Sequence, residues 1–352
     1  MNNHLRLGIF MPNCSNMPNL STYKPDPEDW HFSRNLEISR AAEDAGFDFL
    51  FPVSRWRTFG GECDFLGKSI ETTTWASAIL FGTSRIQIFS TVHVPAFNPL
   101  VVAKMGASLD HIGNGRWGIN IVSGWNQAEF DMMGIKLEDH SRRYERTADF
   151  IQILKGLWTE PPGSFNYDCD WYNIRNGYIN PQPIARPHPP IANAGTSEDA
   201  RNVVAEHCDW AFISPATLDG CAEVAADFKK RGDTFNRKVR CVAAVMVLCR
   251  KTRKEAEKER ETILENLDSV ALGNYLEELG IGSGSFADHT MDELAFGAGA
   301  LPVIGTPEEV AAQLHEVHTS GVDGVLMSYP DYYNDTVSFG KEVVPRLRAL
   351  GS

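Results

Sequence analysis

The amino-acid sequence predicts an α/β protein of the (β/α)8 TIM-barrel class. Short apolar runs alternate along the chain with amphipathic segments of helical period, which is the pattern of parallel βα units. Eight of these runs are predicted strands, and eight units are what this barrel requires. The predicted strands cover residues 5–12, 47–54, 86–95, 116–124, 190–195, 210–214, 239–248 and 322–329. The helical segments include residues 30–45, 69–82, 100–112, 142–158 and 307–320.

Glycines and capping residues mark where helices should end and begin. Gly46 and Gly321 each stand between a helical segment and the next strand, where a helix C-terminus favours glycine. The last connecting helix begins with Thr306-Pro307-Glu308-Glu309. This sequence combines an N-cap threonine, a proline in the first turn and a capping-box glutamate. These junctions support the strand-helix-strand order.

We expect one barrel domain over residues 1–352 with two additions. The first is an aromatic excursion at about residues 160–185, whose segment 165–183 predicts a hairpin or a similar insertion. The second lies at about residues 269–304, where glycines and other small residues predict a mobile loop that acts as a lid. Disorder without a function is the alternative for this second region.

The composition points to a small-molecule substrate. The 352 residues are 43% hydrophobic and carry a net charge of −13, which disfavours nucleic acid and anionic membranes as partners. No segment is apolar enough for a membrane span, and the N-terminus has no signal-peptide core. Seven cysteines without a CxxC pair argue against a disulfide framework and a zinc site. We therefore expect a cytoplasmic protein in a reducing compartment.

In this barrel class the active site lies at the carboxyl ends of the strands. Those ends lack the paired carboxylates of glycoside hydrolysis and the histidine patterns of metal sites, so we expect no metal and a cofactor that supplies the reactivity. Asn120 stands among apolar strand residues, and a buried amide is unfavourable unless a neighbouring strand or a ligand bonds to it. The strand-end residues are Asn13, Ser54, Arg55, Thr91, His93, Asn120, Ser123, Trp125, Gly195, Thr196, Ser197, Ser214, Tyr329 and Asp331.

Two segments predict a phosphate site on the cofactor. Gly195-Thr196-Ser197 leads from a strand end into a helix, where free amides and the helix dipole favour an anion. Arg142-Arg143-Tyr144 opens another helix, and an arginine beside a tyrosine hydroxyl can bind phosphate by charge-assisted hydrogen bonds. The alternatives are an ordinary serine or threonine N-cap in the first segment and a solvated helix face in the second.

Histidine and tryptophan side chains supply the remaining candidates. His93 and His140 lie near strand ends or a helix entry, and either could act as an acid or base near neutral pH. A structural role is the alternative for each. Trp125 and Trp56 could stack on a planar ring, although tryptophans are also common core residues. Glu129 follows Trp125 by one helical turn and could orient the loop or bond the ligand.

Three longer motifs resemble the bacterial luciferase-like FMN-dependent monooxygenases over essentially the full chain. The first runs from Asn114-Gly115-Arg116 to Trp125-Asn126-Gln127-Ala128-Glu129-Phe130. The second is His140-Ser141-Arg142-Arg143-Tyr144-Glu145, and the third is Ile304-Gly305-Thr306-Pro307-Glu308-Glu309-Val310. Within that family the chain is most similar to the group of pyrimidine, dimethylsulfone and alkanesulfonate monooxygenases.

The resemblance implies roles for single residues. Flavin-binding positions are implied for Ser54, Arg55, Asn120, Glu129, Arg143, Tyr144 and Ser197, beside the phosphate contacts expected of Gly195 and Thr196. An oxygen pocket next to the flavin is implied for Thr91, Asn120 and Trp125. His93 would assist the substrate.

The resemblance also implies an activity and partners. Reduced FMN (FMNH2) would come from a separate NAD(P)H-dependent flavin reductase, O2 would be captured as a flavin peroxide or an N5 adduct, and one oxygen atom would enter the substrate. A homo-oligomer, dimer or tetramer, is implied. We expect a small N-heterocycle of pyrimidine type as substrate, although Ser54 and Arg55 depart from the pyrimidine enzyme and make uracil itself doubtful. The alternatives are a small sulfone or alkanesulfonate, an F420-dependent dehydrogenase, and a flavin-binding protein without catalysis.

Overall fold

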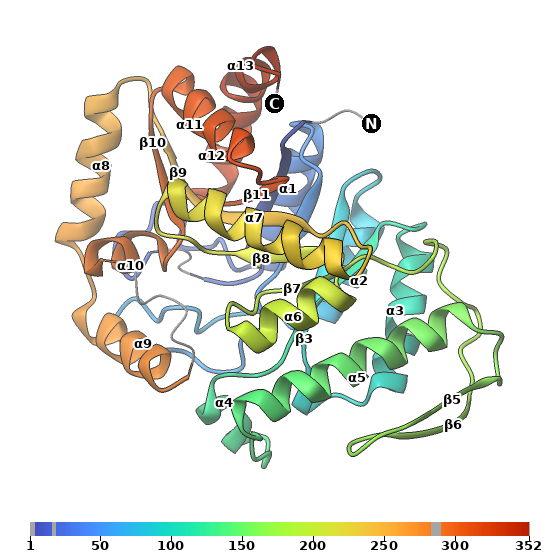
Figure 1. Ribbon diagram of the computed structural model, residues 1–352. Coiled ribbons are helices and arrows are strands. Elements are labelled where there is room, and N and C mark those ends of the chain that lie inside the picture. Colours follow the sequence, from blue (N-terminus) through green and yellow to red (C-terminus); the bar gives the residue numbers. More distant parts are fainter. Residues whose placement is uncertain (1–3, 16–18, 283–289, 352) are drawn as a thin grey trace.

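The computed structural model describes residues 4–15, 19–282 and 290–351 and confirms the predicted (β/α)8 barrel (Figure 1). Eight parallel strands form a ring that closes where β8 pairs with β9 and β11 pairs with β1. In ring order they are β1 (Arg6–Phe10), β2 (Phe49–Phe51), β3 (Gln87–His93), β4 (Trp117–Val122), β7 (Ile191–Asn193), β8 (Trp210–Ile213), β9 (Arg240–Cys249) and β11 (Gly324–Ser328).

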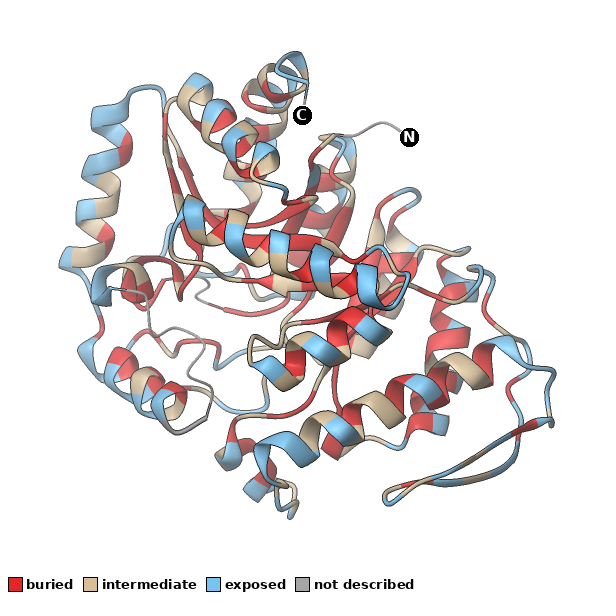
Figure 2. Cartoon of the chain, in the orientation of Figure 1, coloured by how far each residue is buried: buried red, intermediate tan, exposed pale blue. Residues whose placement is uncertain are grey.

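Helices surround the ring and turn their buried faces toward it (Figure 2). The longer ones are α1 (Phe32–Asp44), α2 (Thr72–Gly82), α3 (Pro99–Ile112), α5 (His140–Thr159), α6 (Glu198–His207), α7 (Leu218–Thr234), α8 (Arg253–Glu265), α9 (Ser269–Gly282), α11 (Pro307–Thr319) and α12 (Tyr332–Glu342). The shorter ones are η1 (Val94–Ala96), α4 (Gln127–Met132), α10 (Met291–Gly297) and α13 (Val344–Ala349). No helix in the described ranges is both long and apolar enough to cross a membrane.

The helix boundaries follow the local sequence signals. Thr306 caps α11 and forms the predicted capping box with Glu309. Gly46 and Gly321 follow α1 and α11 with φ of 80° and 103°, a backbone conformation that glycine adopts without a steric penalty. The excursion after α5 is a two-stranded antiparallel hairpin, β5 (Phe165–Asp168) and β6 (Asn173–Gly177), as predicted.

One strand was missed by the sequence prediction. β10 (Leu301–Gly305) pairs in parallel with β9, outside the closed ring. β9 is ten residues long, so its first part pairs with β8 and β11 while its second part holds β10. The end of the expected 269–304 lid is therefore part of the sheet, and α9 and α10 occupy much of what precedes it. Residues 283–289 of that prediction lie outside the described residues.

Aromatic rings fill the barrel interior and form the floor of the site. Phe51 stacks on Phe89 with centroids 4.7 Å apart, and Phe49 contacts both Phe89 and Trp210. Phe10 and Phe212 pack against this cluster and also line the cavity above it. Space for a ligand therefore begins where the aromatic layer ends, at the carboxyl ends of the strands.

Candidate active site

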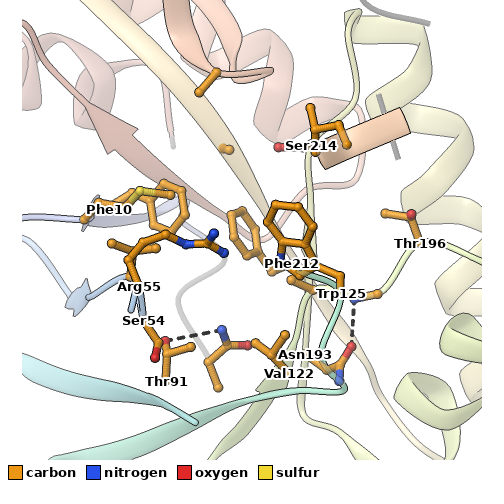
Figure 3. Close-up of a pocket in the computed structure, with 18 of the residues that line it drawn as sticks. Phe10, Ser54, Arg55, Thr91, Val122, Trp125, Asn193, Thr196, Phe212 and Ser214 are labelled. Carbon is orange, nitrogen blue, oxygen red and sulfur yellow. Dashed lines mark hydrogen bonds between the residues drawn. The ribbon is translucent and has the colours of Figure 1, made fainter. Parts of the chain in front are cut away.

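A cavity of about 250 Å³ lies at the carboxyl ends of the barrel strands (Figure 3). Every predicted site residue except Glu129 lines it, as do His140, Ser123 and Ser214. Asn13, Tyr329 and Asp331, which were also strand-end candidates, do not. Asn13 is fully buried and donates to the carbonyl oxygens of Val53 and Ile70, so its role is to hold the strand ends together.

Thr91 and Asn120 face each other on adjacent strands. They are register partners in β3 and β4, and the Asn120 amide donates to the Thr91 hydroxyl at 3.4 Å. That hydroxyl donates to the Pro52 carbonyl at 2.8 Å, so its only proton is already used. The buried Asn120 Oδ1 has no hydrogen-bond partner within the described ranges. An unpaired buried amide oxygen is unfavourable, which favours a ligand that donates a hydrogen bond to it.

His93 and His140 occupy different environments. His93 is 3% exposed, and burial, together with the nearby Arg55 charge, lowers its pKa to about 3. Its imidazole is therefore neutral near pH 7, and the prediction that it titrates near neutrality is wrong. Its Nδ1 lacks a hydrogen-bond partner in the part of the chain that the structure describes. His140 stands at a more exposed part of the wall, 3.7 Å from Asp199.

The turn before α6 is built around Asn193, which the sequence analysis missed. Its Nδ2 donates to the Ile121 carbonyl at 2.5 Å. Its Oδ1 accepts from the Gly195 amide at 2.7 Å (Figure 3). This Asx turn fixes the strand-to-helix connection, and an asparagine two residues before a glycine is a signal that could have identified it. Ser197 then caps α6 by accepting from the Ala200 amide at 3.3 Å.

Arg143 and Tyr144 approach this turn from the first turn of α5. Arg143 donates to the Gly124 carbonyl, while its buried Nε has no hydrogen-bond partner among the described residues. Tyr144 interacts with Ser197 and Ser123, and burial raises its pKa. The neighbouring Arg142 is solvated and paired with acidic side chains, as the alternative interpretation of that segment held. A helix N-terminus, a tyrosine hydroxyl and an unpaired guanidinium nitrogen together favour a bound anion.

Arg55 lies between two aromatic rings. Its guanidinium carbon is 4.8 Å from the ring centre of Trp125 and 5.3 Å from that of Phe59. Behind it, the buried Glu129 accepts from the Trp56 backbone amide at 2.8 Å and lies 3.4 Å from Arg55 Nη1. Glu129 is therefore placed to orient the loop and Arg55 and is not on the cavity wall. Trp56 is 39% exposed and also lies outside the wall, unlike Trp125.

Helix α9 contributes the wall opposite the barrel floor. Tyr275 and Leu279 line the cavity, and Tyr275 contacts the Phe59 ring with centroids 5.1 Å apart. Asn274 donates to the Phe59 carbonyl at 2.7 Å, and Asn126 donates to Glu278. The first described part of the expected lid is thus a helix, α9, packed on the loops after β2 and β4, whereas the sequence analysis predicted a glycine-rich mobile loop.

The charges on the cavity wall are unusual for an acidic protein. Among the described residues no aspartate or glutamate lines the cavity, whereas Arg55 and Arg143 both do. No group of three or more metal-binding side chains occurs in the ranges described. An apolar, aromatic interior with a few fixed polar groups and an anion site at one end is the composition of a cofactor pocket. The residues present therefore fit a planar cofactor that carries a phosphate.

Comparison with known proteins gives consistent similarities. Residues 5–324 match the luciferase-like monooxygenase family. The chain is 27% identical to the FMNH2-dependent dimethylsulfone monooxygenase of Pseudomonas putida, over 99% of this chain and 97% of that protein. It is 30% identical to the pyrimidine monooxygenase RutA of Enterobacter cloacae, over 98% of this chain and 96% of that protein. A crystal structure of riboflavin lyase (RcaE), with modified FMN and riboflavin, superimposes with a TM-score of 0.87 at 22% identity, covering 99% and 92%.

Proposed function

This chain belongs to the luciferase-like monooxygenase family and is a flavin-dependent monooxygenase; from that premise we propose that it is the oxygenase component of a two-component system that uses reduced FMN and O2. One observation of the cavity supports the cofactor most directly. An anion site, built from the α6 N-terminus with Arg143 and Tyr144, opens into an apolar cavity whose buried Asn120 oxygen is unpaired. A phosphate joined to a planar ring matches both features.

The proposal assigns the cofactor contacts to residues on the wall. Gly195, Thr196 and Ser197 would hold the phosphate from the helix end, with Arg143 and Tyr144 beside them. Ser54 and Asn120 would face the ring system, with Asn120 Oδ1 accepting a hydrogen bond. Bound reduced FMN supplies the electrons with which O2 is activated.

The remaining wall residues exclude water and position the reactants. Thr91 orients the Asn120 amide, and Trp125 adds a ring to the cavity wall beside Arg55. His93 stays neutral and acts as a hydrogen-bonding group rather than as a charged acid. We also propose that α9, the first described element of the expected 269–304 lid, covers the cavity as a lid, since its Tyr275 and Leu279 line the cavity. A dry, shaped cavity protects reactive species from hydrolysis.

For the substrate we propose a small N-heterocycle of pyrimidine type. The aromatic side chains around Phe59 and Tyr275 provide flat surfaces for a ring. The second candidate is a small sulfone or alkanesulfonate, because the chain is about equally similar to a dimethylsulfone and to a pyrimidine monooxygenase.

The proposal includes partners beyond the substrate and O2. A separate NAD(P)H-dependent flavin reductase would deliver reduced FMN, and the protein would work in the cytoplasm. We also propose a homo-oligomer. Exposed apolar side chains on the neighbouring helices α2 and α3 support it, namely Phe81, 87% exposed, Val101, 50% exposed, and Ile112, 46% exposed. Burial of these apolar side chains against a second copy of the chain would be favourable.

Oxygen uptake tests this function. Purified protein with FMN, NADH and a general flavin reductase would be given uracil-like heterocycles, larger fused rings, dimethylsulfone and short alkanesulfonates. Mass spectrometry would identify the products. A heterocycle product carrying one added oxygen supports the leading proposal, and a sulfur product supports the second. Uptake that yields only hydrogen peroxide with every compound contradicts both. Oxidation of a substrate with oxidised F420 as the hydride acceptor, without O2, would instead identify a dehydrogenase.

A further inference from the structure

We propose that Arg55 recognises the substrate rather than the flavin, and that the substrate is a planar ring compound bearing an anionic oxygen. This inference rests on the proposed function, because it takes the α6 end of the cavity to be filled by the FMN phosphate. It narrows the candidate substrates to enolates, imide anions, carboxylates and sulfonates on a ring, and it disfavours neutral sulfones.

The two arginines of the wall serve different parts of the cavity. Arg143 belongs with Ser197 and Tyr144 at the α6 end. In Figure 3, Arg55 lies across the cavity from Thr196, beside Phe10 and Ser54, with Trp125 and Phe212 between the two sides. A phosphate held at the turn before α6 therefore leaves Arg55 available for another group. A second cation at a separate position favours a second acceptor on the bound molecules.

The Arg55 guanidinium has unused hydrogen-bonding capacity. Its side chain is only 5% exposed, and Nη1 has no hydrogen-bond partner among the described residues. The Glu129 carboxylate lies 3.4 Å from Nη1, which balances the charge without forming a hydrogen bond. The rings of Trp125 and Phe59 hold the guanidinium by cation–π contacts. A buried and oriented donor of this kind is stabilised by an acceptor that enters the cavity.

The surroundings favour an anion over a neutral acceptor. No acidic side chain of the described residues lines the cavity, and Glu129 stands behind Arg55. His93 is neutral near pH 7, so the positive charge beside it in the cavity is that of Arg55. In a site of low polarity an anion gains the Coulomb attraction of the Arg55 charge in addition to the hydrogen bond, and a neutral acceptor gains the hydrogen bond alone.

The ring requirement comes from an aromatic cluster under α9. Phe59, Phe65 and Tyr275 all line the cavity, with ring centroids 5.1 to 5.7 Å apart. Phe59 also carries the Arg55 guanidinium on its face. A flat substrate seated against this cluster places its polar edge toward Arg55, whereas a small aliphatic substrate leaves the aromatic surface uncovered.

Matched ligand pairs that differ by O⁻ in place of CH3 test the inference. Isothermal titration of protein saturated with oxidised FMN would compare benzenesulfonate with methyl phenyl sulfone, and benzoate with acetophenone. We expect each anion to bind roughly 10- to 100-fold more tightly than its neutral partner, as for a hydrogen bond to a charged group. Methanesulfonate and dimethylsulfone form the same pair without a ring, and we expect methanesulfonate to bind at least tenfold more weakly than benzenesulfonate.

Variants assign the preference to Arg55. R55Q should reduce the anion preference to near one, R55K should retain part of it, and R57Q, which removes an exposed charge on the same loop, should leave it unchanged. A wild-type ratio near one, or an unchanged ratio in R55Q, would overturn the role of Arg55. Equal affinity for methanesulfonate and benzenesulfonate would overturn the ring requirement. If R55Q does not fold, the ratio of anion to neutral-ligand affinity in the wild-type protein and in R55K still tests the role of Arg55. Failure of FMN itself to bind would instead contradict the proposed function.

Discussion

Replacing Gly195 with alanine would disturb the anion site without changing its charge. A Cβ at this position would lie 2.4 Å from the Ala200 Cβ, 2.9 Å from the Tyr144 hydroxyl and 3.0 Å from Asn193 Oδ1. Ordinary carbon contacts begin near 3.5 Å, so the turn and the first residues of α6 must separate by about 1 Å. Overpacking of this size costs about 1–3 kcal/mol. For a chain of 352 residues we expect Tm to fall by roughly 1–4 °C.

The same displacement should weaken FMN binding. Moving the helix end away from Arg143 and Tyr144 removes at least one charge-assisted hydrogen bond to the phosphate, so we expect a rise in the FMN Kd of roughly 10- to 100-fold. Quenching of flavin fluorescence gives the Kd, and thermal unfolding gives Tm. The matched control is Gly273→Ala, at an exposed position inside α9 where a new Cβ meets no atom within 4 Å. It should stabilise the helix and leave FMN binding unchanged. A G195A variant with wild-type Kd and Tm would refute the reasoning.

Three further changes probe other parts of the structure. Asn120→Leu removes an unpaired buried acceptor, so Tm should not fall while turnover drops at least tenfold; a lower Tm with full turnover would contradict this. His93 takes up a proton below pH 6.5 when unfolded but only near pH 3 when folded, so its contribution to stability is lost as pH falls through that window, by at most about 1.4 kcal/mol per pH unit. In the H93Q variant the free energy of unfolding, measured with urea, should depend less on pH over this range. An unchanged pH dependence would be evidence against a depressed His93 pKa. Thr306→Ala removes the N-cap of α11 and should lower the free energy of unfolding by about 1 kcal/mol while turnover stays normal. Unfolding in denaturant measures this loss.

The barrel could be predicted because its signals are local. Each ring strand is an apolar run, and its neighbours follow from the βα alternation. β10 escaped because it directly follows the small residues of the 269–304 region and contains Pro302, which argues against a central strand. Its position on β9, outside the ring, is where proline is tolerated. That pairing depends on the unusual length of β9, which sequence reasoning had no means of linking to a distant segment.

In the candidate site, too, the residues marked by local sequence patterns could be predicted, and those placed by tertiary packing could not. Asn120, Arg143 and Ser197 were accessible from sequence because polar residues at strand and helix ends are visible in the pattern. Phe59 and Tyr275 were not, because they reach the cavity only after the loop following β2 packs against α9. Burial also decided two further points that no motif encodes, the neutral state of His93 and the position of Glu129 behind Arg55.

The central claim is that this cavity uses reduced FMN to insert one atom of O2 into a small ring compound. Turnover under ¹⁸O2 in ordinary water, with a flavin reductase and the tightest-binding ligand from the matched pairs, tests it most directly. The account predicts a product in which the new oxygen is ¹⁸O, with one labelled atom per molecule, and loss of that product in N120L. A product with unlabelled oxygen, or an oxidised product formed without O2, would contradict it.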